Sequence, residues 1–569
     1  MSPFVRMLCR FAAVAAMLAS LSAAADPPAR VGRLSLAEGS VTFRINRQDP
    51  GNPASYNWPV SGGALLDTGP DGRAEVQVGS SVFRLGGDSS VEFTALDDSQ
   101  IALQVWRGAL AANIRDRDQA DQIDVGTPTA QVRFAGPGRY RVDVDDQGGN
   151  TRVASRQGTA YVYRAGEQIP VPDGQRVVIA EGGWIQEVPR RDGFDAWVDA
   201  RDAAGDTIQS LRYVSPEMTG YEDLDRYGQW TSVPDYGAVW YPWSVPADWA
   251  PYRYGRWAWV PPWGWTWVDQ APWGFAPFHY GRWLFLDGRW AWAPGGYIRR
   301  PVYAPALVAW IGDPGGGFGG LPAVGWFPLA PREVFIPAYR CSPGYIRRAN
   351  INQGSSPAAI NQALADPRPH RAFANRALPQ AVTVVAADVL RSGAAISQAH
   401  VLRPDHRDLA RAPVSHRVPD PVRGAATPVP PAAAPALFPP RTGHAFSPVE
   451  NRPVRRQAPP VVAHPAFPAG AAIVAPPAGR PVSPEPAPAI RRHDRPEVPR
   501  SAPRPFLPPP LAAPVRPAAV TPTLPPTVPA PREIAPSPTL AIPQPVPHMP
   551  AIREPREPHH APGNPPHAR

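Results

Sequence analysis

The sequence contains no lysine, so arginine supplies all 57 of its basic residues. It has only two cysteines, and Cys9 lies in a predicted leader segment. Cys341 is then the single cysteine of the mature chain, which excludes an internal disulfide. We interpret Cys341 as an inert thiol rather than a nucleophile, because no histidine is near it in the sequence.

Long hydrophobic runs are also missing, since no segment reaches the about 20 apolar residues that a membrane helix needs. An apolar stretch at the N-terminus, Phe11–Leu21, follows two arginines and precedes the small residues Ala23–Ala25. This pattern is typical of a signal peptide over residues 1–25, and the alternative is an uncleaved anchor. We expect a periplasmic or secreted protein of a Gram-negative-like bacterium, with no transmembrane segment in the mature chain.

Catalytic and metal-binding signatures are scarce. Nine of the 12 histidines follow residue 400, and the sequence has no H-E-x-x-H, G-x-S-x-G or P-loop motif. Gly315–Gly320 has the spacing of a dinucleotide fingerprint, but the prolines after it exclude the required helix and favour a turn. A calcium-loop spacing that begins at Asp143 ends on Ala154, which favours an acidic hairpin tip. We expect no catalytic residue, no metal site and no cofactor.

Aromatic residues other than phenylalanine are missing from residues 401–569, which hold 47 of the 81 prolines. This segment has 20 arginines and 10 acidic residues, a net charge of +10 within a chain total of +9. Such a composition predicts a disordered, extended tail without a packed core. We expect this basic tail to contact an anionic polymer, and we expect no specific nucleic-acid partner.

Residues 30–188 have the alternation of half-buried strands. Apolar and polar residues alternate in Ala74–Val78, Ile101–Val105 and Tyr140–Val144, and glycine-rich turns separate such runs. Many short strands with regular turns predict a mainly β fold, here a β-sandwich or roll.

Several short motifs in this segment resemble the FecR domain, the periplasmic sensing portion of bacterial iron-uptake anti-sigma regulators. They are Leu66–Gly69, Gly72–Glu75, Leu85, Trp106–Gly108, Asp124–Pro128, Gly138–Tyr140 and Gly158. In that family a cytoplasmic segment and a membrane helix precede the domain. This chain has a predicted signal peptide in their place, so the resemblance implies an exported module rather than an anti-sigma factor.

Residues 189–220 are predicted to form a short linking helix. Asp192 can cap a helix that extends to Val214, and an apolar stripe begins at Phe194 and Trp197. We expect this helix to join two β domains.

Tryptophan is concentrated in the middle of the chain, where 13 of the 19 tryptophans lie between Trp230 and Trp292. The sequence Tyr-Gly-x-Trp occurs at 227–230, 254–257 and 280–283, and five residue types recur at an offset of 27. A period of this length indicates repeated supersecondary units. Glycine and proline exclude long helices, so each copy predicts a β-hairpin, within an aromatic repeat domain at 221–350 followed by an extension at 351–400.

The region from about Phe194 to Gly393 resembles a family of exported bacterial proteins of unknown function. The resemblance rests on the aromatic repeats and on Val324–Leu329, Pro331–Glu333, Ala374–Ala377 and Ala381–Val385. Members often carry this aromatic domain behind a FecR-like one. The resemblance implies no known activity.

The alternating tryptophans have two interpretations. In a strand, Trp263, Trp265 and Trp267 share one face and could stack on sugar rings, with arginines adding cation–π contacts. The candidate ligand-binding residues are therefore Trp263, Trp265, Trp267, Arg256, Arg282 and Trp283. Arg289 could add a further cation–π contact or bind an anionic group. In the other interpretation the indoles form the core, because 13 exposed rings would leave roughly 2,000–3,000 Å² of apolar surface in water.

These observations predict a non-enzymatic, exported cell-envelope protein that acts as a binding or scaffold module. Its expected partners are an envelope polysaccharide or an envelope protein. One alternative is a FecR-like periplasmic signalling module. A second is an enzyme acting on cell-wall glycans, which needs two carboxylates about 5 to 9.5 Å apart.

Overall fold

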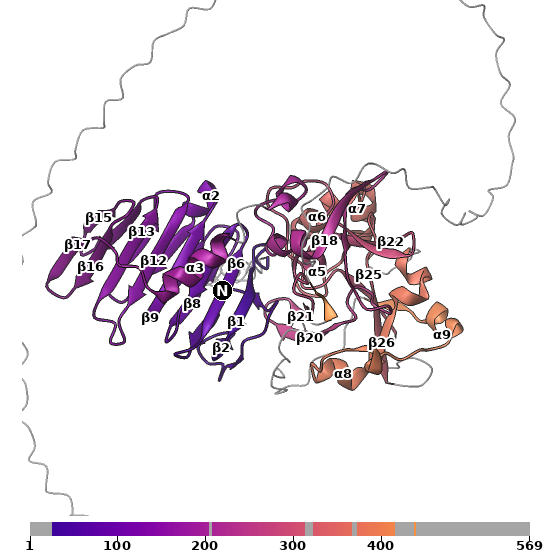
Figure 1. The fold of residues 1–569 in the computed structure, drawn as a ribbon. Coiled ribbons are helices and arrows are strands. Elements are labelled where there is room, and N and C mark those ends of the chain that lie inside the picture. The colour runs from indigo at the N-terminus through magenta and orange to yellow at the C-terminus, as the bar shows by residue number, and fades with distance from the viewer. Residues whose placement is uncertain (1–25, 204–207, 313–321, 367–372, 416–436, 440–569) are drawn as a thin grey trace, which may run out of the picture. The chain divides into compact units, whose positions relative to one another are not determined.

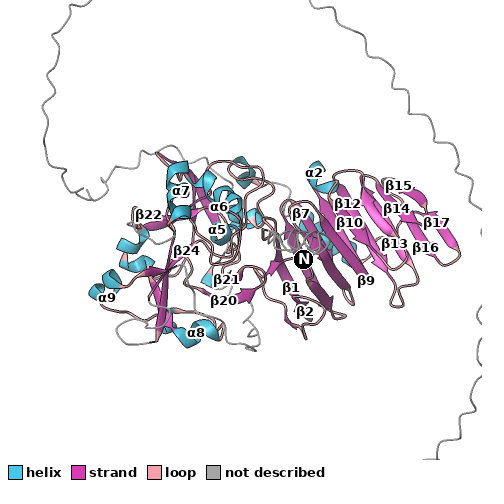
Figure 2. Cartoon of the chain, turned by 180° about the vertical axis from the view of Figure 1, so that it is seen from behind, coloured by secondary structure: helices cyan, strands magenta, loops and turns pink. Residues whose placement is uncertain are grey.

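A computed structural model describes residues 26–203, 208–312, 322–366, 373–415 and 437–439, all within a compact unit that ends at Pro453. Strands dominate these residues, and the helices are few and short (Figures 1 and 2). The mainly β fold predicted from the sequence is confirmed.

The first β domain consists of two layers that share one long strand. In one layer the strands follow the order β4, β1, β6, β7, β9, β12, β13, β16, β17, and in the other β3, β2, β5, β8, β9, β10, β11, β14, β15. Their bounds are β1 (Gly32–Glu38), β2 (Val41–Arg44), β3 (Asn52–Pro53), β4 (Pro59–Val60), β5 (Leu65–Thr68), β6 (Arg73–Val78), β7 (Ser81–Leu85), β8 (Ser90–Leu96), β9 (Ile101–Ile114), β10 (Ile123–Gly126), β11 (Gln131–Phe134), β12 (Gly138–Val144), β13 (Thr151–Gln157), β14 (Ala160–Arg164), β15 (Glu167–Val171), β16 (Arg176–Ala180) and β17 (Gly183–Glu187). The three alternating runs noted in the sequence fall in β6, β9 and β12.

Strand β9 passes from one layer to the other at Gly108. Its first half pairs with β8, and its second half pairs with β7 and β12. Gly108 has φ +82°, and an added Cβ would lie 2.3 Å from the hydroxyl of Ser89. The glycine is required at this crossing because only glycine adopts such a backbone without strain.

The helix in the linking segment is shorter than the sequence predicts. Helix α3 (Gly193–Ala203) ends well before Val214, and residues 209–212 form a separate 3-10 turn, η1 (Gln209–Arg212). The predicted cap is present, since the backbone N–H of Asp195 donates to Oδ1 of Asp192 at 2.9 Å. Phe194 and Val198 pack on Ala111 of the first β domain.

Three hairpins follow, one for each copy of the repeat. They are β18 (Gly228–Val233) with β19 (Gly237–Pro242), β20 (Gly255–Val260) with β21 (Gly264–Asp269), and β22 (Arg282–Leu286) with β23 (Arg289–Ala293). In each hairpin the tryptophan of Tyr-Gly-x-Trp faces a second tryptophan: Trp230 faces Trp240, Trp257 faces Trp267, and Trp283 faces Trp292. The first and third hairpins join through β19 and β23, whereas β20 and β21 form a separate two-stranded sheet.

The glycine of the motif lies beneath the second tryptophan of its hairpin. An added Cβ would lie 2.2 Å from the ring of Trp240 at Gly228, 2.5 Å from Trp267 at Gly255, and 2.5 Å from Trp292 at Gly281. The motif therefore encodes a packing unit, in which one strand leaves out a side chain and the indole of the next strand fills the space.

The fold continues beyond the predicted domain end at 350. The sheet of β24 (Val308–Ile311), β25 (Ala323–Pro328), β26 (Thr383–Ala386) and β27 (Val414–Ser415) includes residues from the expected extension and from the expected tail. The shorter elements are α2 (Arg117–Ala120), η2 (Tyr221–Asp223), α4 (Leu224–Tyr227), α5 (Ala276–His279), α6 (Pro343–Asn350), η3 (Ile351–Gln353), α7 (Pro357–Ala365), η4 (Asn375–Ala377), η5 (Pro379–Ala381), α8 (Ala387–Arg391), η6 (Gln398–His400) and α9 (His406–Arg411).

The prediction that disorder begins at residue 401 was wrong for the first residues of that segment. Residues 406–411 form α9, Val414 pairs with Ile311, and Ala412 is buried in a hydrophobic cluster. The prediction used the average composition of residues 401–569, and most prolines of this segment lie further along the chain. The average therefore did not reveal that its first residues are folded. Apart from 437–439, residues 416–569 lie outside the described chain.

The interior of the aromatic domain is built from indoles. The fully buried tryptophans are Trp240, Trp257, Trp267, Trp273, Trp283, Trp292 and Trp326. Several of their N–H groups donate to backbone carbonyls, for example Trp240 to Leu224 at 3.0 Å and Trp292 to Tyr280 at 2.8 Å. A buried indole N–H usually has such a partner, and these contacts fix the positions of the rings that make them.

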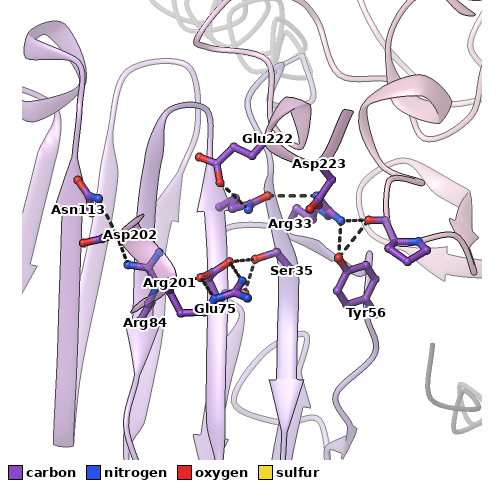
Figure 3. A network of polar contacts seen from close by, with 12 residues as sticks. Arg33, Ser35, Tyr56, Glu75, Arg84, Asn113, Arg201, Asp202, Glu222 and Asp223 are labelled. Atoms are coloured by element: carbon purple, nitrogen blue, oxygen red, sulfur yellow. Dashed lines mark hydrogen bonds and ion pairs between the residues drawn. The ribbon is translucent and has the colours of Figure 1, made fainter. Parts of the chain in front are cut away.

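A network of buried polar side chains centres on Arg33 of β1, which is 0% exposed (Figure 3). Its guanidinium donates to Asn57 at 2.9 Å, to Asp223 at 2.6 Å and to the hydroxyl of Tyr56 at 3.0 Å. It also donates to the backbone carbonyl of Pro272. One side chain therefore ties the first β domain to two segments of the aromatic domain, at Asp223 and at Pro272.

A second group of this network holds α3 against the first β domain (Figure 3). Arg84 contacts Glu75 at 2.8 Å and Asp202 at 2.6 Å, and Arg201 reaches Glu75 at 2.7 Å. Asn113 donates to Asp202 at 2.7 Å. Burial alone would raise the pKa of Glu75, but the hydrogen bond from Arg201 and the charge of Arg84 lower it to about 2. Glu75 therefore stays ionised at neutral pH.

A pH-dependent contribution to stability arises at His279, which is 0% exposed. Burial lowers the pKa of His279 from 6.5 to about 3, and the ring lies at hydrogen-bond distance, 2.8 Å, from the carbonyl of Ala304. The neutral ring therefore contributes stability above pH 6.5, and this contribution is lost as pH falls towards 3. We predict that the difference in unfolding free energy between the wild type and His279→Asn shrinks between pH 7.5 and 4.5.

Denaturant titrations at both pH values measure this difference. His400→Asn is the matched control, because His400 is exposed, and it should leave the pH dependence unchanged. A difference for His279→Asn that is the same at both pH values would contradict the prediction.

Candidate functional site

A cleft of about 610 Å³ lies on the aromatic domain. Its walls come from the end of β19, the loop at 243–249, and the turn between β22 and β23, with Gln380 at its edge. The volume falls within the range of about 300–1,000 Å³ that is usual for small-molecule sites.

The apolar lining of the cleft is mainly aromatic. Trp249 and Trp290 are nearly buried, whereas Trp243 and Phe285 are partly exposed. Phe285 and Trp290 meet edge to face with ring centroids 5.3 Å apart. Nε1 of Trp249 has no hydrogen-bond partner among the described residues, which leaves an unsatisfied donor in the cleft wall.

The polar lining combines amide groups with two arginines that differ in role. Arg253 is buried, and its guanidinium donates to the carbonyls of Asp248 at 2.6 Å and Gln380 at 2.8 Å, so it holds the wall together. Arg289 is exposed and lies over the ring of Tyr241 at 4.7 Å. Of the two arginines, Arg289 is the one whose guanidinium faces solvent.

Asp248 is the one carboxylate in the lining of this cleft. Its Oδ1 accepts a hydrogen bond from the hydroxyl of Tyr254 at 2.6 Å. Glycoside hydrolysis by the usual mechanism needs two carboxylates on opposite sides of the bond. The lining therefore provides surface for stacking and hydrogen bonding, but not that pair.

The structure places the six candidate residues from the sequence in the interior rather than on a surface. The exposed fractions are 3% for Trp263, 8% for Trp265, 0% for Trp267, 4% for Arg256, 1% for Arg282 and 1% for Trp283. An indole platform must be open on one face, so these residues match the core interpretation. We do not propose them as ligand contacts.

Arg256 and Arg282 occupy enclosed positions among aromatic and backbone groups. Arg256 lies over the ring of Trp58 at 5.3 Å, and Arg282 donates to Asn350 at 2.9 Å. Burial lowers the pKa of each guanidinium to about 10, because a charge in an apolar interior loses its hydration. Both arginines stay charged at neutral pH and act as structural residues.

One feature of the sequence could have indicated the cleft, namely two tryptophans that are not part of the repeat. Trp243 and Trp249 lie between the first and second hairpins, outside the positions that recur at the offset of 27. Neither tryptophan lies in a hairpin strand, since β19 ends at Pro242 and β20 begins at Gly255, so pairing across a hairpin does not explain them. Arg289, by contrast, was named from the sequence, and it lies at the cleft.

Two further expectations concern reactive groups. Burial, together with the nearby carboxylate of Asp26, raises the pKa of Cys341 to about 11, so its thiol is protonated at neutral pH. Among the described residues, no three histidine, cysteine or acidic side chains are grouped as metal ligands would be. The glycine-rich segment at 315–320 lies outside the described residues.

Comparison with known proteins identifies a known domain family in one segment of the chain. Residues 221–333 match a family model described as "Family of unknown function (DUF6600)", so the chain carries a DUF6600 domain there. No curated protein matches the chain. Within the described ranges, no helix has both the length and the apolar character needed to cross a membrane.

Two crystal structures resemble part of the chain, both of a Parabacteroides distasonis protein described as an anti-sigma factor, at 1.65 and 2.50 Å resolution. They are 15% and 16% identical to this chain, with a TM-score of 0.21 in each case. Each match covers 24% of this chain and 64% or 63% of the other, so the chain spans less than two thirds of those proteins. The FecR resemblance of residues 30–188 stays a prediction.

Proposed function

We propose that this protein is a cell-envelope binding protein that holds an anionic envelope glycan in the cleft of its aromatic domain. The observation that carries the proposal is the composition of the cleft: an aromatic lining, amide groups at the edge, and an exposed arginine. Such a lining suits a sugar ring, whose apolar face lies on an aromatic surface while its hydroxyls meet a few polar groups.

The charges around the cleft favour an acidic ligand. Arg289 is exposed, whereas Asp248 already accepts a hydrogen bond from the hydroxyl of Tyr254. A carboxylate on the ligand would gain a charge-assisted hydrogen bond from a guanidinium that has lost little hydration. Peptidoglycan fragments, which combine amino sugars with carboxylates, are the probe that this chemistry selects.

The signal peptide predicted at residues 1–25 supports an envelope location. A net charge of +10 in residues 401–569 supports a second contact with anionic polymers, through a segment that lies mostly outside the described residues. The two contacts would act together, since a tethered second site raises the effective concentration of the first.

We predict that the full chain binds soluble peptidoglycan fragments and that Arg289→Ala weakens this binding about tenfold, the effect of losing about 1.4 kcal/mol. Calorimetric titration at two salt concentrations measures the affinity, and the Arg289 contribution should decrease at high salt. Arg107→Ala is the matched control, because Arg107 is an exposed arginine of β9, outside the cleft.

Equal affinities for Arg289→Ala and Arg107→Ala, or no binding by the wild type, would overturn the proposal. The same samples test the enzymatic alternative, because binding alone leaves the masses of the fragments unchanged. A periplasmic signalling role remains a separate prediction that this experiment does not address.

A further inference from the structure

The last described residues of the chain, Leu437–Pro439, contain one deeply buried side chain. Phe438 is 1% exposed, although Leu437 beside it is 44% exposed and belongs to the proline-rich part of the sequence. Phe438 also belongs to the main hydrophobic core, which is otherwise formed by residues 31–396. A single phenylalanine therefore inserts into the folded body from a segment whose composition does not support a core of its own.

Two aromatic residues form the walls of the socket that receives Phe438. Its ring meets Trp273 at a centroid distance of 6.2 Å and an angle of 90°, and Tyr254 at 6.4 Å and 85°. Both are edge-to-face geometries, which are attractive beyond the burial of apolar area. We call Tyr254 and Trp273 the Phe438 socket.

The walls of the socket are held by contacts that do not involve Phe438. Trp273 packs against Trp240 at 4.9 Å and Trp249 at 5.7 Å, and the Tyr254 hydroxyl donates to Asp248 at 2.6 Å. A binding site whose walls are fixed in advance loses little conformational entropy when a ligand enters. Trp249 and Asp248 also line the glycan cleft, so two residues of the cleft support the walls of the socket.

The sequence around Phe438 recurs in the tail. All four phenylalanines after residue 400 are followed by proline at the next or second position, in Phe438-Pro439, Phe446-Ser447-Pro448, Phe467-Pro468 and Phe506-Leu507-Pro508. Proline fixes its own φ and restricts the preceding residue to an extended backbone, which reduces the conformational entropy that a peptide loses on binding. Aromatic-lined grooves recognise proline-rich segments for this reason.

We propose that the Phe438 socket is a peptide-binding site for Phe-Pro segments of a proline-rich chain, and that residues 437–439 of this same chain are its resident occupant. The site attaches the basic tail to the aromatic domain next to the glycan cleft. Because the segment is tethered, its effective concentration at the socket is of the order of millimolar, which excludes weaker external peptides. The proposal does not depend on glycan binding.

The first test uses the wild-type full chain and hydroxyl-radical footprinting read by mass spectrometry. Phe438 should be oxidised at least fivefold more slowly than Phe446, which has the same proline-rich context. Equal oxidation of the two side chains in the folded protein would overturn the proposal, and unfolding in denaturant should abolish the difference.

The second test titrates a labelled peptide of residues 431–443 into full-length variants. Phe438→Ala should bind it with an affinity of the order of 100 μM, and the wild type and Phe446→Ala about tenfold more weakly, as a millimolar competitor requires. Protection of Phe446, Phe467 or Phe506 in Phe438→Ala would also support the site, since a second tail segment then fills it. Peptide binding by Phe438→Ala that is no tighter than binding by the other two proteins, without new protection of Phe446, Phe467 or Phe506, would contradict the proposal.

Discussion

Replacing Gly255 with alanine should lower the free energy of unfolding by about 2–3 kcal/mol, the upper part of the usual range for an overfilled core. An added Cβ would lie 2.5 Å from the Trp267 ring and 2.5 Å from the carbonyl oxygen of Val268. Trp267 cannot move aside, because its Nε1 donates to Asp269 at 2.8 Å and its ring packs on Trp257. Urea unfolding followed by tryptophan fluorescence measures the loss.

Gly149→Ala is the matched control, because a Cβ at Gly149 meets nothing within 4 Å and its φ is not in the left-handed region. It should change stability by less than about 0.5 kcal/mol. If Gly255→Ala were as stable as this control, the glycine of the repeat would not be a packing position, and the explanation of the motif would fail.

Arg33→Met should cost about 3–5 kcal/mol, the typical loss when one partner of a buried ion pair is removed. The variant keeps the length of the side chain but removes the guanidinium that donates to Asp223 and Asn57, and it leaves the carbonyl of Pro272 with the Tyr56 hydroxyl as its donor. Because Arg33 links the first β domain to the aromatic domain, we also expect these two domains to unfold at different denaturant concentrations. Circular dichroism and tryptophan fluorescence should then report separate transitions.

Arg133→Met serves as the control for the loss of an arginine. Arg133 also pairs with a carboxylate, Asp124, at 2.6 Å, but the two side chains are 64% and 28% exposed. Exposed pairs contribute little, so this variant should unfold as the wild type does. A similar small effect for Arg33→Met would show that the buried network does not hold the domains together.

Local patterns in the sequence were sufficient to predict the hairpins and the first strands. Alternation with a period of two identifies β9 and β12, because a strand that buries one face must alternate. It also identifies β6, although β6 buries both faces and its Glu75 belongs to the buried polar network. The repeat at an offset of 27 identifies the hairpins, because each copy places two tryptophans opposite each other. These features depend on neighbouring residues, so no knowledge of distant contacts was needed.

The features that the sequence did not reveal depend on distant contacts. Arg33 and Asp223 are 190 residues apart, and nothing in either local sequence indicates that they pair. The cleft brings together the loop at 243–249, the turn before Arg289 and residue Gln380, which only the tertiary fold places side by side. The burial of Phe438 was not predicted either, because the composition of the whole tail does not reveal a single residue that packs into the core.

The tryptophan pattern alone does not distinguish a buried core from an exposed binding platform, but the amount of apolar surface involved does. Alternation placed Trp263, Trp265 and Trp267 on one face, but it did not say whether that face was open. The area argument favoured burial for most of the rings, and the structure buries these three. It also leaves Trp259 46% exposed at a site away from the cleft, where it is useful as a reference.

The most direct test of glycan binding is fluorine NMR of the full chain labelled with 5-fluorotryptophan, titrated with peptidoglycan fragments. Single Trp→Phe variants assign the resonances of Trp243, in the cleft, and Trp259, exposed elsewhere. If the cleft is the binding site, the Trp243 resonance shifts in a saturable manner while that of Trp259 stays in place. A Trp243 resonance that does not move at saturating fragment, or equal shifts at both positions, would contradict the assignment of the cleft as the binding site.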